Sequence, residues 1–219
     1  MTLPSRPYAA FLFDMDGTLL TSVASAERAW STWALGHGLD PADVLAVMHG
    51  VRAVETVRRF APAGADIDAE TRAITELEIA DVADIEEIPG AAAFLASLPA
   101  GSWALVTSAS RRLAEVRLAA AGMALPPVMI CAEDVTQGKP APDCFLAGAR
   151  KLGVAIGDCL VFEDAHAGFA AAKAAGADAV AITATHRQPL DLGLPTLADY
   201  RGVGISRDEN GALRLIRKD

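Results

Sequence analysis

Short apolar runs alternate with segments of helical periodicity along most of this 219-residue chain. Residues 8–13 form one such run, and its length and aromatic content favour a strand that is covered on both faces. Further strands are predicted at residues 103–106, 128–131, 159–162 and 179–182. Helical patterns separate them at residues 90–98, 111–121, 143–152 and 168–175. Strands that alternate with helices predict right-handed crossovers, and therefore an α/β fold with a doubly wound, Rossmann-like parallel sheet.

Residues 22–85 depart from this alternation because they contain helical patterns only. These patterns cover residues 24–36, 41–49, 53–60 and 69–83. An all-helical block inserted just after the first strand indicates a mobile cap over the site of the sheet, with hinges near residues 20–23 and 84–89. We therefore expect an α/β core domain of residues 1–21 and 86–219, and a helical cap domain of residues 22–85. Two alternating runs within residues 201–218 predict a terminal hairpin.

Polar side chains stand where several of the predicted strands end. Asp14 and Asp16 follow the first strand, Thr107 follows the second, and Glu163 follows the fourth. Doubly wound sheets place their sites outside the carboxyl ends of the strands, so these side chains are expected to meet. Side chains at i and i+2 of an extended backbone share a face, and two carboxylates in one site repel each other. A bound divalent cation such as Mg²⁺ would relieve that repulsion.

Composition narrows the classes of function. A hydrophobic fraction of 52% and a charged fraction of 21% predict a compact globule, and a net charge of −9 argues against a nucleic-acid partner. The odd number of cysteines without C-x-x-C spacing (Cys131, Cys144 and Cys159) argues against a disulfide scaffold or a zinc site. A signal peptide is not predicted, because the apolar run from Tyr8 is short and leads directly into charged residues. A membrane span is not predicted either, because the longest Ala-rich stretch, residues 165–182, contains charged residues. A cytoplasmic enzyme is the expectation.

The residues at the strand ends suit the transfer of a phosphoryl group. A carboxylate can attack phosphorus while a metal ion and a lysine neutralise the equatorial oxygens. Hydroxyl and backbone N–H groups can hold the remaining oxygens, and a second carboxylic acid can protonate the leaving alkoxide.

Four separated motifs make the chain resemble the haloacid dehalogenase-like hydrolase superfamily, in the form with a helical cap after the first strand. In chain order they are Asp14–Thr18, Val106–Ser108, Gly138–Pro140 and Val161–Ala165. The resemblance covers nearly the whole chain. Residues 49–52, 60–62, 137–140 and 162–165 are similar to those of the sugar and polyol phosphatases, a group that includes glycerol-phosphate and 2-deoxyglucose-6-phosphate phosphatases.

The resemblance implies a role for each motif. Asp14 would be the nucleophile that becomes aspartyl-phosphate, and Asp16 would act as general acid and then as general base. Lys139 would screen Asp14 and the transferring group. Mg²⁺ would be held by Asp14, by Asp164 and by Asp16 through its carbonyl, with Glu163 either a further ligand or a support behind the ligands.

Substrate contacts are implied by the same resemblance. Thr107, Ser108 and the residue after them would bind the phosphate; that residue is Ala109, where such enzymes commonly have Gly. Arg52 is either a solvated helix residue or a contact from the cap to the substrate. His49 has the same two interpretations, a structural residue or a substrate contact.

The predicted function is that of a Mg²⁺-dependent phosphatase acting on a small sugar or polyol phosphate. The alternative is a sugar phosphomutase similar to β-phosphoglucomutase, which would share the core residues but protect its aspartyl-phosphate from water. A non-catalytic binding protein is disfavoured because Asp14, Asp16 and Lys139 are all present. The expected partner is a small phosphorylated metabolite, and the expected oligomeric state is a monomer or a weak homodimer.

Overall fold

The computed structural model describes residues 3–186 and 193–218. Within them, the main sheet has the strand order β3-β2-β1-β4-β5-β6, and all neighbouring strands run parallel. The strands are β1 (Ala10–Phe13), β2 (Trp103–Val106), β3 (Met129–Ile130), β4 (Cys159–Glu163), β5 (Asp178–Ile182) and β6 (Thr196–Leu197). The predicted doubly wound sheet is confirmed. Only β6 was not expected, since a two-residue strand is too short to give a periodic signal.

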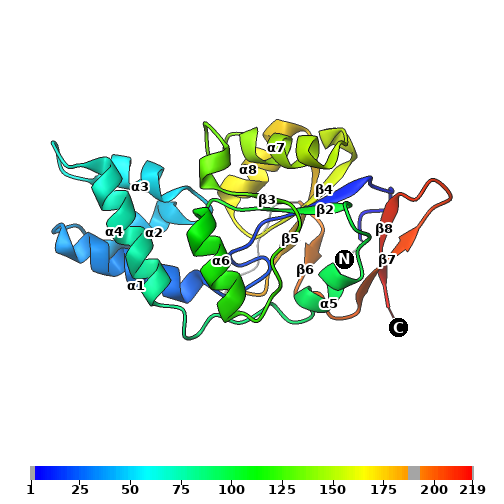
Figure 1. Ribbon diagram of the computed structural model, residues 1–219, viewed down its shortest axis with the longest axis horizontal. Coiled ribbons are helices and arrows are strands. Elements are labelled where there is room, and N and C mark those ends of the chain that lie inside the picture. Colours follow the sequence, from blue (N-terminus) through cyan, green and yellow to red (C-terminus); the bar gives the residue numbers. More distant parts are fainter. Residues whose placement is uncertain (1–2, 187–192, 219) are drawn as a thin grey trace.

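Helices cover both faces of this sheet (Figure 1). α7 (Asp143–Leu152) and α8 (His166–Ala175) pack on one face, and α5 (Ala91–Ala96) and α6 (Arg111–Ala120) pack on the other. Single 3₁₀ turns, η1 (Ala132–Asp134) and η2 (Ile156–Asp158), complete the connections. Strand β1 contributes Phe11 and Phe13 to one hydrophobic cluster and Leu12 to the other, because successive side chains of a strand point to opposite faces.

Packing between β1 and β4 fixes where these two strands end. Phe13 lies opposite Phe162 in the parallel register, and their rings stack with centroids 4.4 Å apart. The amide of Asp14 then donates to the carbonyl of Phe162 at 3.0 Å. As a result, the acidic residues that follow the two strands emerge side by side at the same edge of the sheet.

Residues 23–80 form a separate group of helices, here called the helical unit (Figure 1). Its helices are α1 (Val23–Gly36), α2 (Pro41–Met48), α3 (Ala53–Phe60) and α4 (Ile67–Ala80). They enclose their own hydrophobic cluster, in which Trp30 and Trp33 meet edge to face at 5.6 Å. α4 begins two residues before the predicted start because Asp66 caps it by accepting from the N–H groups of Asp68 and Ala69.

The two connections between the helical unit and the sheet lie next to each other. The amide of Thr21 donates to the carbonyl of Glu86 at 2.8 Å, and the amide of Ile88 donates to the carbonyl of Leu19 at 2.8 Å. Both segments fall within the predicted hinge regions. The two connections therefore run side by side where they join the helical unit to the sheet.

The C-terminal segment forms the predicted hairpin from β7 (Val203–Arg207) and β8 (Leu213–Arg217). Tyr8 and Leu213 exchange backbone hydrogen bonds of 2.8 and 2.7 Å, so the hairpin lies beside the start of β1. Among the described residues, no helix combines the length and the apolar character that crossing a membrane requires.

Candidate active site

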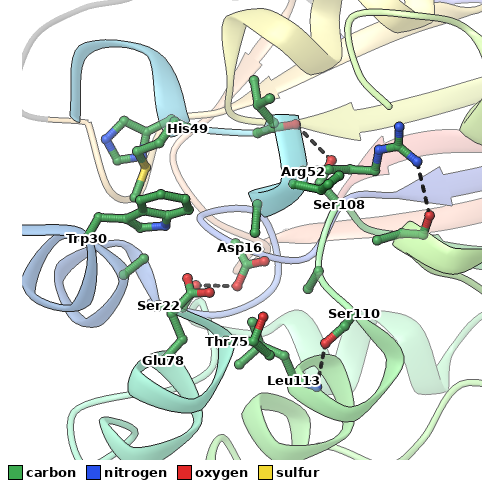
Figure 2. A pocket seen from close by; sticks show the side chains of 18 of the residues that line it. Asp16, Ser22, Trp30, His49, Arg52, Thr75, Glu78, Ser108, Ser110 and Leu113 are labelled. Atoms are coloured by element: carbon green, nitrogen blue, oxygen red, sulfur yellow. Dashed lines mark hydrogen bonds between the residues drawn. The ribbon is translucent and has the colours of Figure 1, made fainter. Parts of the chain in front are cut away.

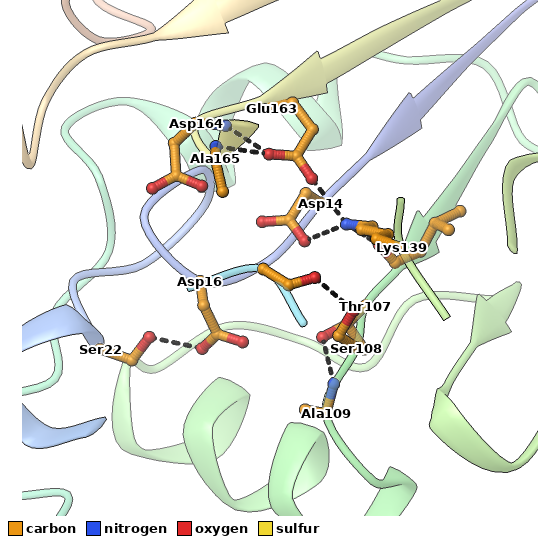
Figure 3. A network of polar contacts seen from close by, with 12 residues as sticks. Asp14, Asp16, Ser22, Thr107, Ser108, Ala109, Lys139, Glu163, Asp164 and Ala165 are labelled. Carbon is orange, nitrogen blue, oxygen red and sulfur yellow. Dashed lines mark hydrogen bonds and ion pairs between the residues drawn. The ribbon is translucent and has the colours of Figure 1, made fainter. Parts of the chain in front are cut away.

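Lys139 joins the ends of three strands. Its ammonium donates to Asp14 Oδ1 at 2.6 Å, to Glu163 Oε1 at 2.7 Å and to the carbonyl of Val106 at 3.3 Å (Figure 3). The side chain is fully buried. Burial would lower its pKa, but the charges of Asp14 and Glu163 outweigh this effect and raise the pKa above the ordinary lysine value. Lys139 therefore carries a fixed positive charge next to Asp14.

Glu163 supports Lys139 from behind. Its second oxygen, Oε2, accepts the N–H groups of Asp164 and Ala165, both at 2.7 Å, while Oε1 accepts from Lys139. A Cβ atom at Gly168 would lie 1.6 Å from Glu163 Oε1, so only glycine lets α8 pack directly against this carboxylate. With both of its oxygens occupied in this way, Glu163 fits the supporting role better than that of a metal ligand.

The carboxylates of Asp14 and Asp164 lie close together, and a bound cation would offset the repulsion between them. Carboxylate oxygens of Asp14, Glu163 and Asp164 all lie within 4.8 Å of one another. Burial is the largest influence on Asp14 and Asp164 and raises both pKa values, with repulsion among the carboxylates adding to it. Gly17 has φ of +80°, and a Cβ there would lie 2.0 Å from Asp164 Oδ2, so the loop after β1 approaches this carboxylate with its backbone. A hard, oxygen-seeking cation of the Mg²⁺ type fits these donors.

The side chain of Asp16 points away from that group of carboxylates. Its Oδ1 accepts a hydrogen bond from the hydroxyl of Ser22 (Figures 2 and 3). It also accepts one from Nη1 of Arg117 at 3.0 Å. Arg117 also donates through Nη2 to Glu78 Oε1 at 3.0 Å. Asp16 thus faces the helical unit while Asp14 faces Lys139, and the two aspartates have separate surroundings.

The predicted phosphate-binding residues lie at the end of β2. Thr107 is buried, and its hydroxyl oxygen accepts from the N–H of Ala109 at 3.0 Å. Ser108 donates to the carbonyl of Gly50 at 2.8 Å and so contacts the helical unit. The structure brings all three residues to the site, with the Ser108 hydroxyl and the Ala109 amide hydrogen-bonded within the protein.

Arg52 is buried at the boundary between the helical unit and the sheet, with all five N–H donors in use. Nε and Nη2 donate to Glu55 Oε1 at 3.0 and 2.6 Å. Nη1 donates to the carbonyls of Ala132 and Val135 at 3.3 and 3.0 Å, and Nη2 also donates to the carbonyl of Thr136 at 2.9 Å. The expectation of a solvated helix residue is therefore wrong. The guanidinium binds Glu55 and the loop of residues 132–136, here called the core loop, so it has no free donor for the expected contact with the substrate.

His49 lies at the edge of the site. Its Nε2 is 3.3 Å from Glu27 Oε1, and the ring is partly exposed. Burial lowers its pKa, against the opposing influence of Glu27. The position is compatible with either of the two interpretations given above.

A cavity of ≈ 340 Å³ lies between the sheet and the helical unit. Asp14, Asp16 and Asp164 line it on the sheet side. Trp30 and Glu78 are among the residues that line it from the helices (Figure 2). Such a volume suits a small molecule.

Sequence reasoning missed Arg117, Glu78, Ser22 and Glu55. The signal for Arg117 was available: it lies on the same face of α6 as the buried residues Leu113 and Ala114, where an arginine needs a partner. The identity of its partners depends on how the helical unit packs, which the sequence pattern does not contain.

A family model described as haloacid dehalogenase-like hydrolase matches residues 8–176. The chain belongs to this family. Hexitol phosphatase A of Escherichia coli is 41% identical over 92% of this chain and 95% of the relative. Glycerol-1-phosphate phosphohydrolase 2 of Saccharomyces cerevisiae is 34% identical over 84% of this chain and 80% of the relative. A crystal structure of a hydrolase from Pseudomonas syringae has a TM-score of 0.75, with 26% identity over 87% of this chain and 93% of that one.

The resemblance to sugar and polyol phosphatases is thereby confirmed, and this haloacid dehalogenase-like hydrolase is an enzyme of the phosphatase type. The four motifs that predicted the family meet around Asp14: the end of β1, the end of β2, the loop with Lys139 and the end of β4.

Proposed function

We propose that the chain is a Mg²⁺-dependent phosphatase of a small sugar or polyol phosphate that works through an aspartyl-phosphate on Asp14. The observation that carries this proposal is the pairing of Asp14 with Lys139 at 2.6 Å next to Asp164. The hexitol and glycerol-1-phosphate phosphatases named among the relatives support the substrate class.

Asp14 is the nucleophile in this proposal. Lys139 binds only Oδ1, which leaves Oδ2 as the oxygen that attacks phosphorus. Lys139 also neutralises charge that develops on the transferring group. Asp14, Asp164 and the carbonyl of Asp16 would hold Mg²⁺, which would supply further neutralisation of the phosphoryl oxygens.

Asp16 acts on the leaving group. It protonates the alkoxide oxygen as the ester bond breaks and, once ionised, takes a proton from the water that hydrolyses the aspartyl-phosphate. Its surroundings differ from those of Asp14, because Ser22 and Arg117 contact Asp16 whereas Lys139 contacts Asp14, so the two aspartates can take different roles.

In this proposal the helical unit forms most of a cap of residues 22–85, which moves against residues 1–21 and 86–219. The adjacent segments at Thr21 and Glu86 are the hinge. Arg52 and Glu55 hold the closed position, since Arg52 donates to three carbonyls of the core loop and Glu55 Oε1 accepts the N–H of Gly138 at 3.1 Å. Closure excludes bulk water from the cavity during phosphoryl transfer.

The charge of the cavity wall favours hydrolysis over a mutase reaction. A mutase would hold a second phosphate away from Asp14, and that phosphate needs an unpaired cation. Among the described residues that line the cavity, Arg52 has no free donor and Arg117 is paired with two carboxylates. Trp30 offers an aromatic face instead, which suits a neutral, hydroxyl-rich leaving group.

A phosphate-release screen tests the proposal. Purified protein is incubated with sugar, polyol and nucleotide monophosphates, with Mg²⁺ and with a chelator, alongside the Asp14→Asn variant. Release from a sugar or polyol phosphate that needs Mg²⁺ and Asp14 is expected. With glucose 1-phosphate, formation of glucose 6-phosphate without free phosphate would instead identify a mutase.

A further inference from the structure

A buried arginine connects the candidate general acid to the helical unit. Arg117 on α6 is 3% exposed, and its guanidinium donates to Asp16 and to Glu78, each at 3.0 Å. Glu78 belongs to α4 and is 5% exposed. Three segments far apart in the sequence therefore meet through one side chain.

We propose that Arg117 is a positioning residue that fixes the Asp16 carboxylate beside the leaving group, and that Glu78 ties this position to closure of the cap. The inference rests on the proposed function, because it requires Asp16 to act on the leaving group. None of the four sequence motifs contains Arg117 or Glu78.

The hydrogen bonds of Asp16 support the proposal that Arg117 positions its carboxylate. Ser22 and Arg117 both bind Oδ1, and among the described residues no partner binds Oδ2. Two donors on one oxygen fix the plane of the carboxylate and leave the other oxygen available for the proton transfer. Arg117 also lines the cavity, so it lies next to where the leaving group would be.

A purely structural role does not account for the burial of Arg117. The helices α4 and α6 are already joined at the surface by the exposed ion pair of Arg112 with Glu76. Burying a guanidinium costs free energy that an apolar side chain of similar size would avoid. Its Nε is buried and has no hydrogen-bond partner among the described residues, which adds to the free energy that burial of this side chain costs.

The contact between Glu78 and Arg117 makes the position of Arg117, and therefore of Asp16, depend on closure of the cap. It is part of the helical unit, whereas Asp16 and Arg117 belong to the core. With the cap closed, Arg117 is shared between two carboxylates and its guanidinium plane is held from both sides. When the cap opens, Glu78 leaves with it, and of the two carboxylates described here Arg117 keeps Asp16.

The experiment compares two leaving groups. We measure kcat/KM for glycerol 3-phosphate, or the best polyol phosphate of the screen, and for p-nitrophenyl phosphate, whose leaving group needs little protonation. Arg117→Ala is expected to lose about 100-fold on the polyol phosphate but only a few-fold on p-nitrophenyl phosphate. Arg112→Ala, which removes the other α4–α6 ion pair, should stay within about 2-fold on both.

A double-mutant cycle separates positioning from packing. If Arg117 acts through Asp16, adding Arg117→Ala to Asp16→Ala costs no further activity on the polyol phosphate. Glu78→Gln is expected to lose about 10-fold on the polyol phosphate, with no further loss in the Arg117→Ala background. Arg117→Lys should recover part of the loss, because it restores one donor.

The possible results separate a failure of this inference from a failure of the proposed function. Equal losses on both substrates, or full additivity with Asp16→Ala, would overturn the inference while the proposed function stands. Absence of phosphate release by the wild-type protein from every ester would overturn the proposed function, and the inference with it.

Discussion

Lys139 lies 2.6 Å from Asp14 although 125 residues separate them in the sequence. Neither residue is exposed enough to be screened by water, since Asp14 is 4% exposed and Lys139 fully buried. A buried ammonium and carboxylate at this distance stabilise each other strongly, and removal of one partner leaves an uncompensated charge. The pairing engages one oxygen of Asp14, and in the proposed function the other oxygen attacks the phosphate ester.

Asp14→Asn is expected to abolish phosphate release while the protein stays folded. The amide has nearly the same shape as the carboxylate but cannot attack phosphorus, and Lys139 keeps Glu163 as its charged partner. Phosphate release is compared with that of the wild type, and circular dichroism and thermal unfolding establish the fold. Measurable turnover by a folded variant would contradict the role given to Asp14.

Asp16→Ala is expected to reduce kcat/KM for a polyol phosphate by about 10²- to 10⁴-fold, the usual contribution of general acid catalysis. The loss on p-nitrophenyl phosphate should be far smaller, because that leaving group departs without a proton. kcat/KM is the appropriate measure, since it reports the steps up to departure of the leaving group. Similar losses on both substrates would count against the acid role.

Arg52→Ala is expected to weaken closure of the cap. The substitution removes three hydrogen bonds to core carbonyls and leaves Glu55 without its cation, so the open form gains population. We expect kcat/KM to fall by about 10-fold or more, and the radius of gyration from small-angle scattering to increase. The matched control is Arg58→Ala, which lies exposed on the same helix α3 and should change neither quantity.

Removal of metal should make stability depend on pH. Burial raises the pKa of Asp14 from 3.8 to about 7 and also raises that of Asp164. A carboxyl with a raised pKa binds its proton more tightly in the folded state, so chelator-treated protein loses stability as pH rises from about 4 to about 7. Mg²⁺ replaces these protons, and its stabilising effect should therefore grow across the same window.

Thermal unfolding in chelator and in millimolar Mg²⁺, measured at several pH values, checks this prediction. Asp164→Asn should flatten the pH dependence of the chelated protein, because one of the two carboxyls no longer titrates. An effect of Mg²⁺ on the melting temperature that does not change between pH 4 and pH 7 would contradict the assignment of these carboxylates.

The sequence by itself determined the sheet, the helices and the motifs. Apolar runs such as residues 10–13 bury both faces of a strand, and this local pattern needs no tertiary information. Asp14 was predicted from its position at a strand end, and the roles of Lys139 and Asp164 came from the family resemblance. They meet because parallel strands end at one edge of the sheet.

The tertiary structure alone decided what lies between the helical unit and the sheet. Arg52 is occupied by core carbonyls, and Arg117 joins Asp16 to Glu78. These contacts depend on how two separately packed units face each other, and periodicity describes each helix but not its neighbour across an interface. The apolar face of α6 indicates that Arg117 needs a partner, but it does not name that partner, which only the packed structure identifies.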